Sequence, residues 1–236
     1  MTAEATVVTL DGPSGAGKTT VGRAVAARIG AVFVDTGLMY RALTVAAAER
    51  GIDTGDASRL GELARSVTID VRAAETPGGS ERVLLDGRDV SDALRNPAVD
   101  RAVSAVSRHA AVRDAMVAVQ RRAAVSGRVV MAGRDIGTVV VPDATLKVFL
   151  HAAPEVRAGR RAAEMAEPDR HDEYLREISE RDASDSGRAV APLRVPDGAL
   201  VLDTGRLDVK ACVETIVTAL SERTSARERA QLPRRR

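Results

Sequence analysis

The residues best suited to chemistry lie in a glycine-rich stretch near the N-terminus, where a lysine precedes two threonines. The stretch reads Gly12, Pro13, Ser14, Gly15, Ala16, Gly17, Lys18, Thr19 and Thr20. It fits the pattern G-x-x-x-x-G-K-[ST], in which backbone N–H groups surround a phosphate chain. Lys18 would reach the β- and γ-phosphates, and the Thr19 hydroxyl would help to hold Mg²⁺ together with phosphates and water. We therefore expect the stretch to bind a nucleoside triphosphate; the alternative is a glycine-rich turn that only caps a helix.

The flanking residues favour the phosphate site over a plain turn. Residues 7–10 form an apolar run typical of a short buried strand, and apolar residues follow helical spacing from residue 21 to residue 29. Strand, loop and helix thus occur in the order that a phosphate loop requires. The partial positive charge of the helix N-terminus would then face the ligand.

Other sequence features separate the possible classes of triphosphate-binding protein. The chain contains a single asparagine, Asn96, which is followed by Pro97, so the Asn-Lys-x-Asp motif of a GTPase switch is absent. The apolar residues 129–132 end in Gly-Arg-Asp, whereas a mechanical ATPase usually has paired acids there. Arginine is abundant, and lysine occurs only at Lys18, Lys147 and Lys210. Clustered arginines are typical of small-molecule kinases, because the planar guanidinium matches phosphate oxygens.

Four groups of residues could supply arginines and polar side chains that bind phosphate in this way. They are Thr36 and Arg41 after the second predicted strand, Arg134 and Asp135 after the strand at 128–132, Arg157, Arg160 and Arg161 on one predicted helix, and Arg181, Asp185 and Arg188 at spacings that share a helical face. Each group alone also has a structural explanation: a helix cap, a turn with an internal ion pair, a solvated basic face, or a surface salt-bridge ladder.

Alternating strand and helix signals predict an α/β fold, a parallel sheet flanked by helices. The core strands are expected at residues 7–10, 31–34, 128–132, 146–150 and 199–202. Further helices are expected at residues 38–50, 110–124, 154–166, 171–185 and 208–222, the last one capped by Asp208.

One segment interrupts this alternation. Residues 67–71 and 82–85 have strand-like patterning and are joined by a turn cluster at 75–80, and residues 86–90 resemble a tight turn into a third strand. We expect a small antiparallel lobe inserted at about residues 62–95.

Composition limits the partners and the compartment. The chain of 236 residues has a net charge of +2, but six arginines and two glutamates follow from Ser221 onward, so the first 220 residues carry −2. With 2% aromatic residues and no tryptophan, nucleic acid is not an expected partner. Residues 226–236 are expected to be a disordered Arg-rich tail, the alternative being a tail that binds an anion. A lone cysteine, Cys212, and the absence of a signal peptide or a long apolar run indicate a cytoplasmic protein without a membrane span.

Several motifs together resemble bacterial cytidylate kinases. They are residues 12–18, Asp35-Thr36-Gly37 with Tyr40-Arg41, residues 133–140, and residues 180–182 with residues 188–193, in this order over residues 5–205. The last two are specific to that family. The resemblance implies a five-stranded parallel sheet, a lid that carries arginines, and phosphoryl transfer from ATP to CMP or dCMP with Mg²⁺. It implies one kinase domain over residues 1–225 with the lid at about 154–188, and we expect a monomer.

The resemblance also assigns site residues. The cytosine edge falls to Ser104, Arg113 and Asp135, the monophosphate to Thr36, Tyr40, Arg41 and Arg134, the sugar and phosphates to Arg181, Asp185 and Arg188, and the lid to Arg157 and Arg161. The catalytic cations would be Lys18, Arg134, Arg157, Arg161 and Arg181. One departure concerns the metal: relatives have an acid just before Gly-Arg-Asp, where this chain has Ala132, and Asp11 or water would have to replace it.

Two alternatives stay open at this stage. One is a kinase for another monophosphate, chiefly UMP or dTMP. The other is an ATP-binding interaction protein without catalysis, which would bind ATP but form no ADP with any acceptor.

Overall fold

The central sheet of the computed structural model is parallel, and its topology places the phosphate loop at the middle strand. The structure describes residues 6–72, 81–125 and 127–231. The sheet has the order β2-β6-β1-β7-β8, which confirms the predicted fold class. Its strands are β1 (Thr6–Asp11), β2 (Val32–Asp35), β6 (Arg128–Gly133), β7 (Leu146–His151) and β8 (Leu200–Asp203). Asp11 lies opposite Gly133, and Asp35 lies opposite Ala132, so these strands end at one edge.

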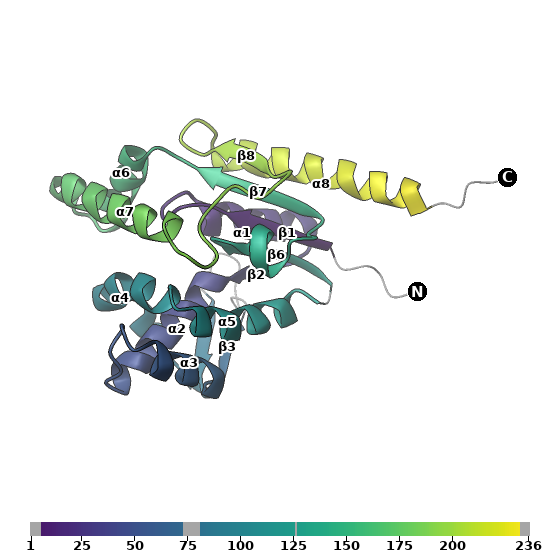
Figure 1. The fold of residues 1–236 in the computed structure, drawn as a ribbon. Helices are drawn as coiled ribbons and strands as arrows, with labels where there is room; N and C mark the ends of the chain where they lie inside the picture. The colour runs from purple at the N-terminus through teal and green to yellow at the C-terminus, as the bar shows by residue number, and fades with distance from the viewer. Residues whose placement is uncertain (1–5, 73–80, 126, 232–236) are drawn as a thin grey trace.

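Helices cover both faces of this sheet, because successive residues of its strands are apolar and point to opposite faces. Val8 and Leu10 pack toward α1 (Lys18–Ile29) and α8 (Val209–Gln231). Val7 and Met131 point the other way, into a core shared with α2 (Thr36–Glu49) and α5 (Ala110–Ala123). Figure 1 shows α8 on one side of the sheet and α2, α3 and α5 on the other.

A lobe follows α2 along the chain and comprises residues 57–123. It contains α3 (Ala57–Ser66), the antiparallel sheet β3 (Ile69–Arg72), β4 (Arg82–Leu85) and β5 (Arg88–Asp89), the 3₁₀ turn η1 (Ala93–Arg95), α4 (Pro97–Ser107) and α5. The antiparallel strands match the sequence prediction, except that residues 73–80, with the turn cluster, lie outside the described residues. The prediction missed α3 and α4, although Asp56 and Asn96 cap their first turns.

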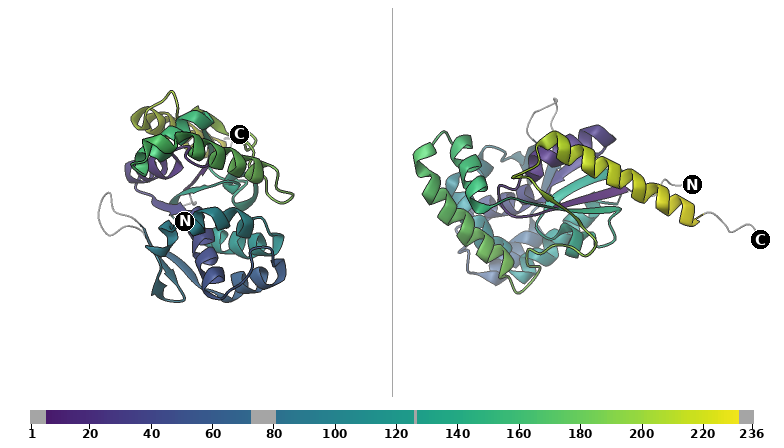
Figure 2. Two further views of the ribbon diagram at one scale, coloured as in Figure 1. Left: turned by 90° about the vertical axis from the view of Figure 1, so that its left-hand side faces the viewer. Right: turned by 90° about the horizontal axis from the view of Figure 1, so that it is seen from above.

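Two helices form a hairpin beyond the carboxyl edge of the sheet. They are α6 (Pro154–Glu164) and α7 (His171–Ser186), joined by the 3₁₀ turn η3 (Pro168–Arg170). Ala158, Ala162, Tyr174 and Ile178 form a small core between them. This helical hairpin lies on the opposite side of the molecule from the two ends of the chain (Figures 1 and 2). It occupies the span in which the sequence predicts a lid.

The last helix is longer than predicted. Asp208 caps its first turn by accepting from the Ala211 N–H at 2.7 Å, as expected, and Cys212 is buried. The helix continues past Glu222 to Gln231 and so includes residues 226–231, which the sequence analysis assigned to the tail. Residues 232–236 lie outside the described part. No helix of the described residues is long and apolar enough to cross a membrane.

Helix α1 approaches the sheet closely at Gly22. A Cβ there would lie 2.3 Å from Phe33 Cε2 and 3.0 Å from Leu10 Cδ1. We expect Gly22→Ala to lower the free energy of unfolding by roughly 1–3 kcal/mol, because the ring must shift in a packed core. Urea denaturation measures the change. In the control Gly159→Ala, on α6, no atom lies within 4 Å of the new Cβ. The free energy of unfolding of that variant should be unchanged or higher by up to about 1 kcal/mol. Equal losses of unfolding free energy in the two variants would contradict the packing argument.

Candidate active site

The loop after β1 adopts a path that requires glycine. Gly12 has φ 148°, and a Cβ at this position would lie 2.0 Å from the Leu150 carbonyl oxygen. Gly17 precedes α1 with φ 80°, in the left-handed region. The loop therefore enters α1 directly from the central strand, with Lys18 and Thr19 in the first turn.

Lys18 faces its own loop. Its Nζ donates to the carbonyl oxygens of Gly12, at 2.8 Å, and Pro13, at 2.6 Å. Burial and the nearby Arg134 lower the pKa of Lys18 well below its ordinary value, and Asp35 only partly opposes them. An anion at this edge of the sheet would therefore stabilise the charged lysine.

An acid lies beside Thr19, and it comes from β2. Thr19 Oγ1 donates to Asp35 Oδ2 at 2.8 Å, while the other oxygen of Asp35 accepts from the Gly37 N–H. A hydroxyl next to a carboxylate suits Mg²⁺, which prefers oxygen ligands and binds largely through phosphates and water. The described residues contain no cluster of three or more acidic, His or Cys side chains that could hold a metal ion alone.

Asp11, which the sequence offered as a substitute for the missing acid at Ala132, has another role. Its two carboxylate oxygens accept from the backbone N–H groups of Ile136 and Gly137, each at 2.7 Å. These residues begin η2 (Ile136–Val140), a π-helical turn after β6. Burial raises the pKa of Asp11 to about 6, although the two N–H groups act in the opposite direction. Asp11 thus connects the central strand to the loop that carries Arg134 and Asp135.

Arg113 and Asp135 form a buried ion pair between α5 and the end of β6. The Tyr40 ring lies against this pair, with its centroid 5.5 Å from the Arg113 guanidinium carbon. Burial raises the pKa of Tyr40 to about 12. The Tyr40 hydroxyl and Arg113 Nε are buried without a hydrogen-bond partner among the described residues. Ser104, predicted to act with this pair, lies on α4, and no hydrogen bond in the described chain joins its hydroxyl to the pair.

A second ion-pair group joins β6 to the end of α7. Asp185 accepts from Arg134 Nε at 2.8 Å and from Arg188 at 2.6 Å. Burial would raise the pKa of Asp185, but the two guanidinium groups outweigh it and lower that pKa. Because α7 ends at Ser186, Arg188 approaches from beyond the helix. The prediction that it shares a helical face with Arg181 and Asp185 is therefore wrong, and so is an internal pair between Arg134 and Asp135.

Arg181 has no carboxylate within ion-pair distance among the described residues, and its Nε is buried without a hydrogen-bond partner. Burial, and then the positive charge of Arg134, lower the pKa of Arg181 to about 10, while Asp185 opposes them. Together with Lys18, this arginine gives the carboxyl edge of the sheet an uncompensated positive charge.

The hairpin contacts the phosphate loop through two arginines. Arg157 donates to the Ser14 carbonyl at 3.0 Å and pairs with Asp182 at 2.6 Å. Arg160, which the sequence analysis grouped with Arg157 and Arg161 but to which the resemblance assigned no role, donates to the Thr204 carbonyl at 2.5 Å and to the Gly15 carbonyl at 3.4 Å.

The remaining predicted residues lie at the edges of this group. Thr36 Oγ1 donates to the Ala132 carbonyl at 2.9 Å and so joins α2 to β6. Arg41 and Arg161 both contact Asp100, a residue that the sequence analysis did not single out. Its position in the first turn of α4, where an acid commonly stabilises a helix, gave no functional signal.

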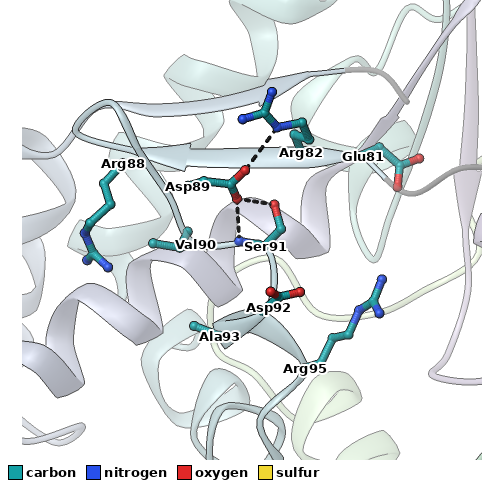
Figure 3. A pocket seen from close by; sticks show the side chains of 9 residues that line it. All are labelled: Glu81, Arg82, Arg88, Asp89, Val90, Ser91, Asp92, Ala93 and Arg95. Carbon is teal, nitrogen blue, oxygen red and sulfur yellow. Dashed lines mark hydrogen bonds and ion pairs between the residues drawn. The ribbon is translucent and has the colours of Figure 1, made fainter. Parts of the chain in front are cut away.

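A hollow of about 600 Å³ lies elsewhere, beside the small antiparallel sheet. Figure 3 shows its lining: Asp89 accepts from Arg82 Nε and from Ser91. Glu81, also on its wall, pairs with Arg23 of α1. None of the predicted site residues lines this hollow, so we place the candidate active site at the carboxyl edge of the main sheet.

The fold and this site define a phosphate-loop kinase, a phosphotransferase whose sheet ends in a glycine-rich loop facing clustered arginines. A gluconokinase from Sinorhizobium meliloti has the same fold, with a TM-score of 0.52 at 15% identity, covering 98% of this chain and 100% of that one. The family profile described as cytidylate kinase matches residues 8–222. The chain belongs to the cytidylate kinase family, which confirms the resemblance in the sequence.

Curated relatives agree with this family. The cytidylate kinase of Pelotomaculum thermopropionicum is 44% identical over 218 residues, which cover 91% of this chain and 95% of that protein. The cytidylate kinase of Rhodococcus jostii is 43% identical over 224 residues, which cover 93% and 96% of the two chains.

The raised pKa of Asp11 predicts a pH-dependent stability. Between about pH 4 and pH 6 the Asp11 carboxyl group loses its proton in the unfolded chain but retains it in the folded chain. The folded state therefore loses stability as the pH rises through this range. The amide introduced by Asp11→Asn does not titrate. The unfolding free energy of the wild type relative to this variant should therefore fall by about 2 kcal/mol between pH 4 and pH 7. Urea titrations of both proteins across this range measure the difference, and a constant difference would refute the burial argument.

Proposed function

We propose that this protein transfers the γ-phosphoryl group of ATP to CMP or dCMP, giving ADP and CDP or dCDP. The observation that carries the proposal is the uncompensated positive charge of Lys18 and Arg181 beside the loop after β1. Two phosphorylated substrates would supply the missing negative charge. The proposal extends what family membership states, because it names the acceptor and the residues that meet it.

The donor would lie on the loop of residues 12–20. Backbone N–H groups and the N-terminus of α1 would hold its phosphates, and Lys18 would exchange its present carbonyl partners for phosphate oxygens. Thr19 and Asp35 would hold Mg²⁺, directly or through water. When bound, this ion would neutralise charge on the β- and γ-phosphates.

The acceptor base would lie against Arg113 and Asp135. Cytosine has an amino donor and two acceptors, which match a carboxylate and a guanidinium. The pair is buried, and the Tyr40 ring lies against its guanidinium. Ser104, on the neighbouring α4, is proposed as a third contact with the base.

The acceptor phosphate would lie among Thr36, Tyr40, Arg41 and Arg134, and the sugar near Asp185 and Arg188. Asp185 already orients Arg134 and Arg188 by accepting from both. Arg181, with Arg157 and Arg161 of the hairpin, would neutralise charge on the phosphoryl group in flight. No side chain needs to act as a nucleophile, because the acceptor phosphate oxygen attacks in line.

Lys18→Ala should abolish most turnover and leave the fold intact. Loss of a preorganised cation at the transferred phosphates commonly costs about a hundredfold or more in kcat. A coupled ADP-release assay with CMP, dCMP, UMP, AMP, GMP and dTMP tests the donor and the acceptor together. Lys210→Ala, an exposed lysine on α8, is the matched control and should retain wild-type rates. A near-normal kcat in Lys18→Ala would show that the loop does not have the catalytic role proposed here.

Asp135→Ala should impair CMP use far more than ATP binding. The change removes the carboxylate assigned to the cytosine amino group and leaves Arg113 buried without its partner charge. We expect the KM for CMP to rise at least about tenfold, with the Kd for ATP nearly unchanged. Asp143→Ala, at an exposed position, controls for loss of negative charge. If ATP affinity falls while the KM for CMP is unchanged, Asp135 belongs to the ATP site and its assignment to the cytosine base is wrong.

A further inference from the structure

Asp100 joins two arginines that come from different parts of the fold. One carboxylate oxygen contacts Arg41 of α2, and the other accepts from Arg161 of α6 at 3.0 Å. The three side chains are partly buried, with exposures of 22% for Arg41, 23% for Asp100 and 35% for Arg161. Each oxygen thus holds one guanidinium, and the acid lies between two like charges.

The bridge crosses from the lobe to the hairpin. Asp100 is in the first turn of α4, whereas Arg161 is near the end of α6. Arg41, which lies on α2 before the lobe, also donates to the Leu94 carbonyl of the lobe at 3.1 Å, which fixes its guanidinium against η1. On the hairpin side, Arg161 has a second partner, Glu164, at 3.2 Å, but 69% of that glutamate is exposed. Asp100 is therefore the better shielded partner of Arg161.

Without Asp100, Arg41 of α2 and Arg161 of the hairpin would repel each other. Their charges add to those of Lys18, Arg134 and Arg181 nearby. Asp100 reaches this wider group, because its charge raises the pKa of Arg181 against the effects of burial and of Arg134. An isolated surface ion pair contributes little, but one carboxylate shared by two arginines in a positive region forms a network.

We propose that Asp100 is a positioning residue that holds Arg41 and Arg161 at a fixed separation and thereby couples the hairpin to the lobe. This inference rests on the proposed function, in which Arg41 meets the acceptor phosphate and Arg161 the transferred group. The remaining guanidinium N–H groups of both arginines stay available for phosphate oxygens. The positions of these two guanidinium groups are then set before the substrates arrive, which reduces the entropy lost in reaching the reactive geometry.

Asp100→Asn tests this role because it removes the charge and keeps the size of the side chain. We expect kcat/KM for CMP to fall about tenfold, since a small displacement of a charged group costs about this much or more. The KM for ATP should stay within about twofold, because the phosphate loop is untouched. Asp100→Glu retains the charge and should recover part of the loss.

Glu164→Gln is the matched control. It removes the other acidic partner of Arg161 and should behave as the wild type. If Asp100→Asn keeps kcat and lowers the KM for CMP, the carboxylate competes with phosphate and the proposal is wrong. A lower Tm with unchanged kinetics would reduce Asp100 to a structural role, which also overturns it.

A second measurement needs no substrate and so stands apart from the proposed function. Hydrogen exchange of residues 154–188 in the ligand-free protein should be faster in Asp100→Asn and in Arg161→Gln than in the wild type or in Glu164→Gln. Arg161→Gln breaks the bridge from the hairpin side, so its hydrogen exchange tests the coupling even if the Asp100 variant folds poorly. Unchanged exchange in the soluble variants would refute the coupling. Absence of CMP turnover by the wild type would instead refute the proposed function.

Discussion

The structure depends on a concentration of positive charge at the carboxyl edge of a parallel sheet. Arg134 lies close enough to Lys18 and Arg181 to lower the pKa values of both, a cost that folding must offset. Carboxylates on separate elements compensate most of this positive charge. Asp185 on α7 forms an ion pair with Arg134, and Asp135 after β6 forms one with Arg113. These acids also fix the directions of the guanidinium groups. Charge that would destabilise an empty site is thereby kept in place for polyanionic ligands.

Asp11 performs a related task without pairing to a cation. It lies in the centre of the sheet edge and accepts from two successive N–H groups of the loop after β6. That loop carries both Arg134 and Asp135, whose side chains diverge to α7 and α5. One buried carboxylate thus orients two different ion-pair groups. The unfavourable burial that raises its pKa is partly offset by these hydrogen bonds.

The succession of strands along the chain and the phosphate loop could be predicted from sequence, because residues 7–20 carry a motif of fixed spacing and the strands are short apolar runs. Contacts between segments that are distant in the sequence could not be predicted in this way. Thr19 meets Asp35 only because β1 and β2 end at the same edge, with β6 between them. Arg134 and Asp135 are adjacent in sequence, but their side chains point apart, so Asp135 pairs with Arg113, with which the resemblance had grouped it, whereas Arg134 pairs with Asp185. Helices α3 and α4 were missed, although both have capped first turns and buried apolar residues at helical spacing: Leu60, Leu63 and Ala64 in α3, and Val99, Val103 and Val106 in α4.

The hairpin arginines contact the outside of the phosphate loop, at its carbonyl oxygens. Arg157 binds the oxygen of Ser14, and Arg160 lies 3.4 Å from that of Gly15. Each of these peptide groups has its N–H on the opposite side, at Gly15 and Ala16. A cation at a carbonyl oxygen draws electron density through the amide, and hydrogen-bonded chains of this kind strengthen cooperatively. The hairpin therefore polarises these peptide units of the loop from behind and makes their N–H groups stronger donors.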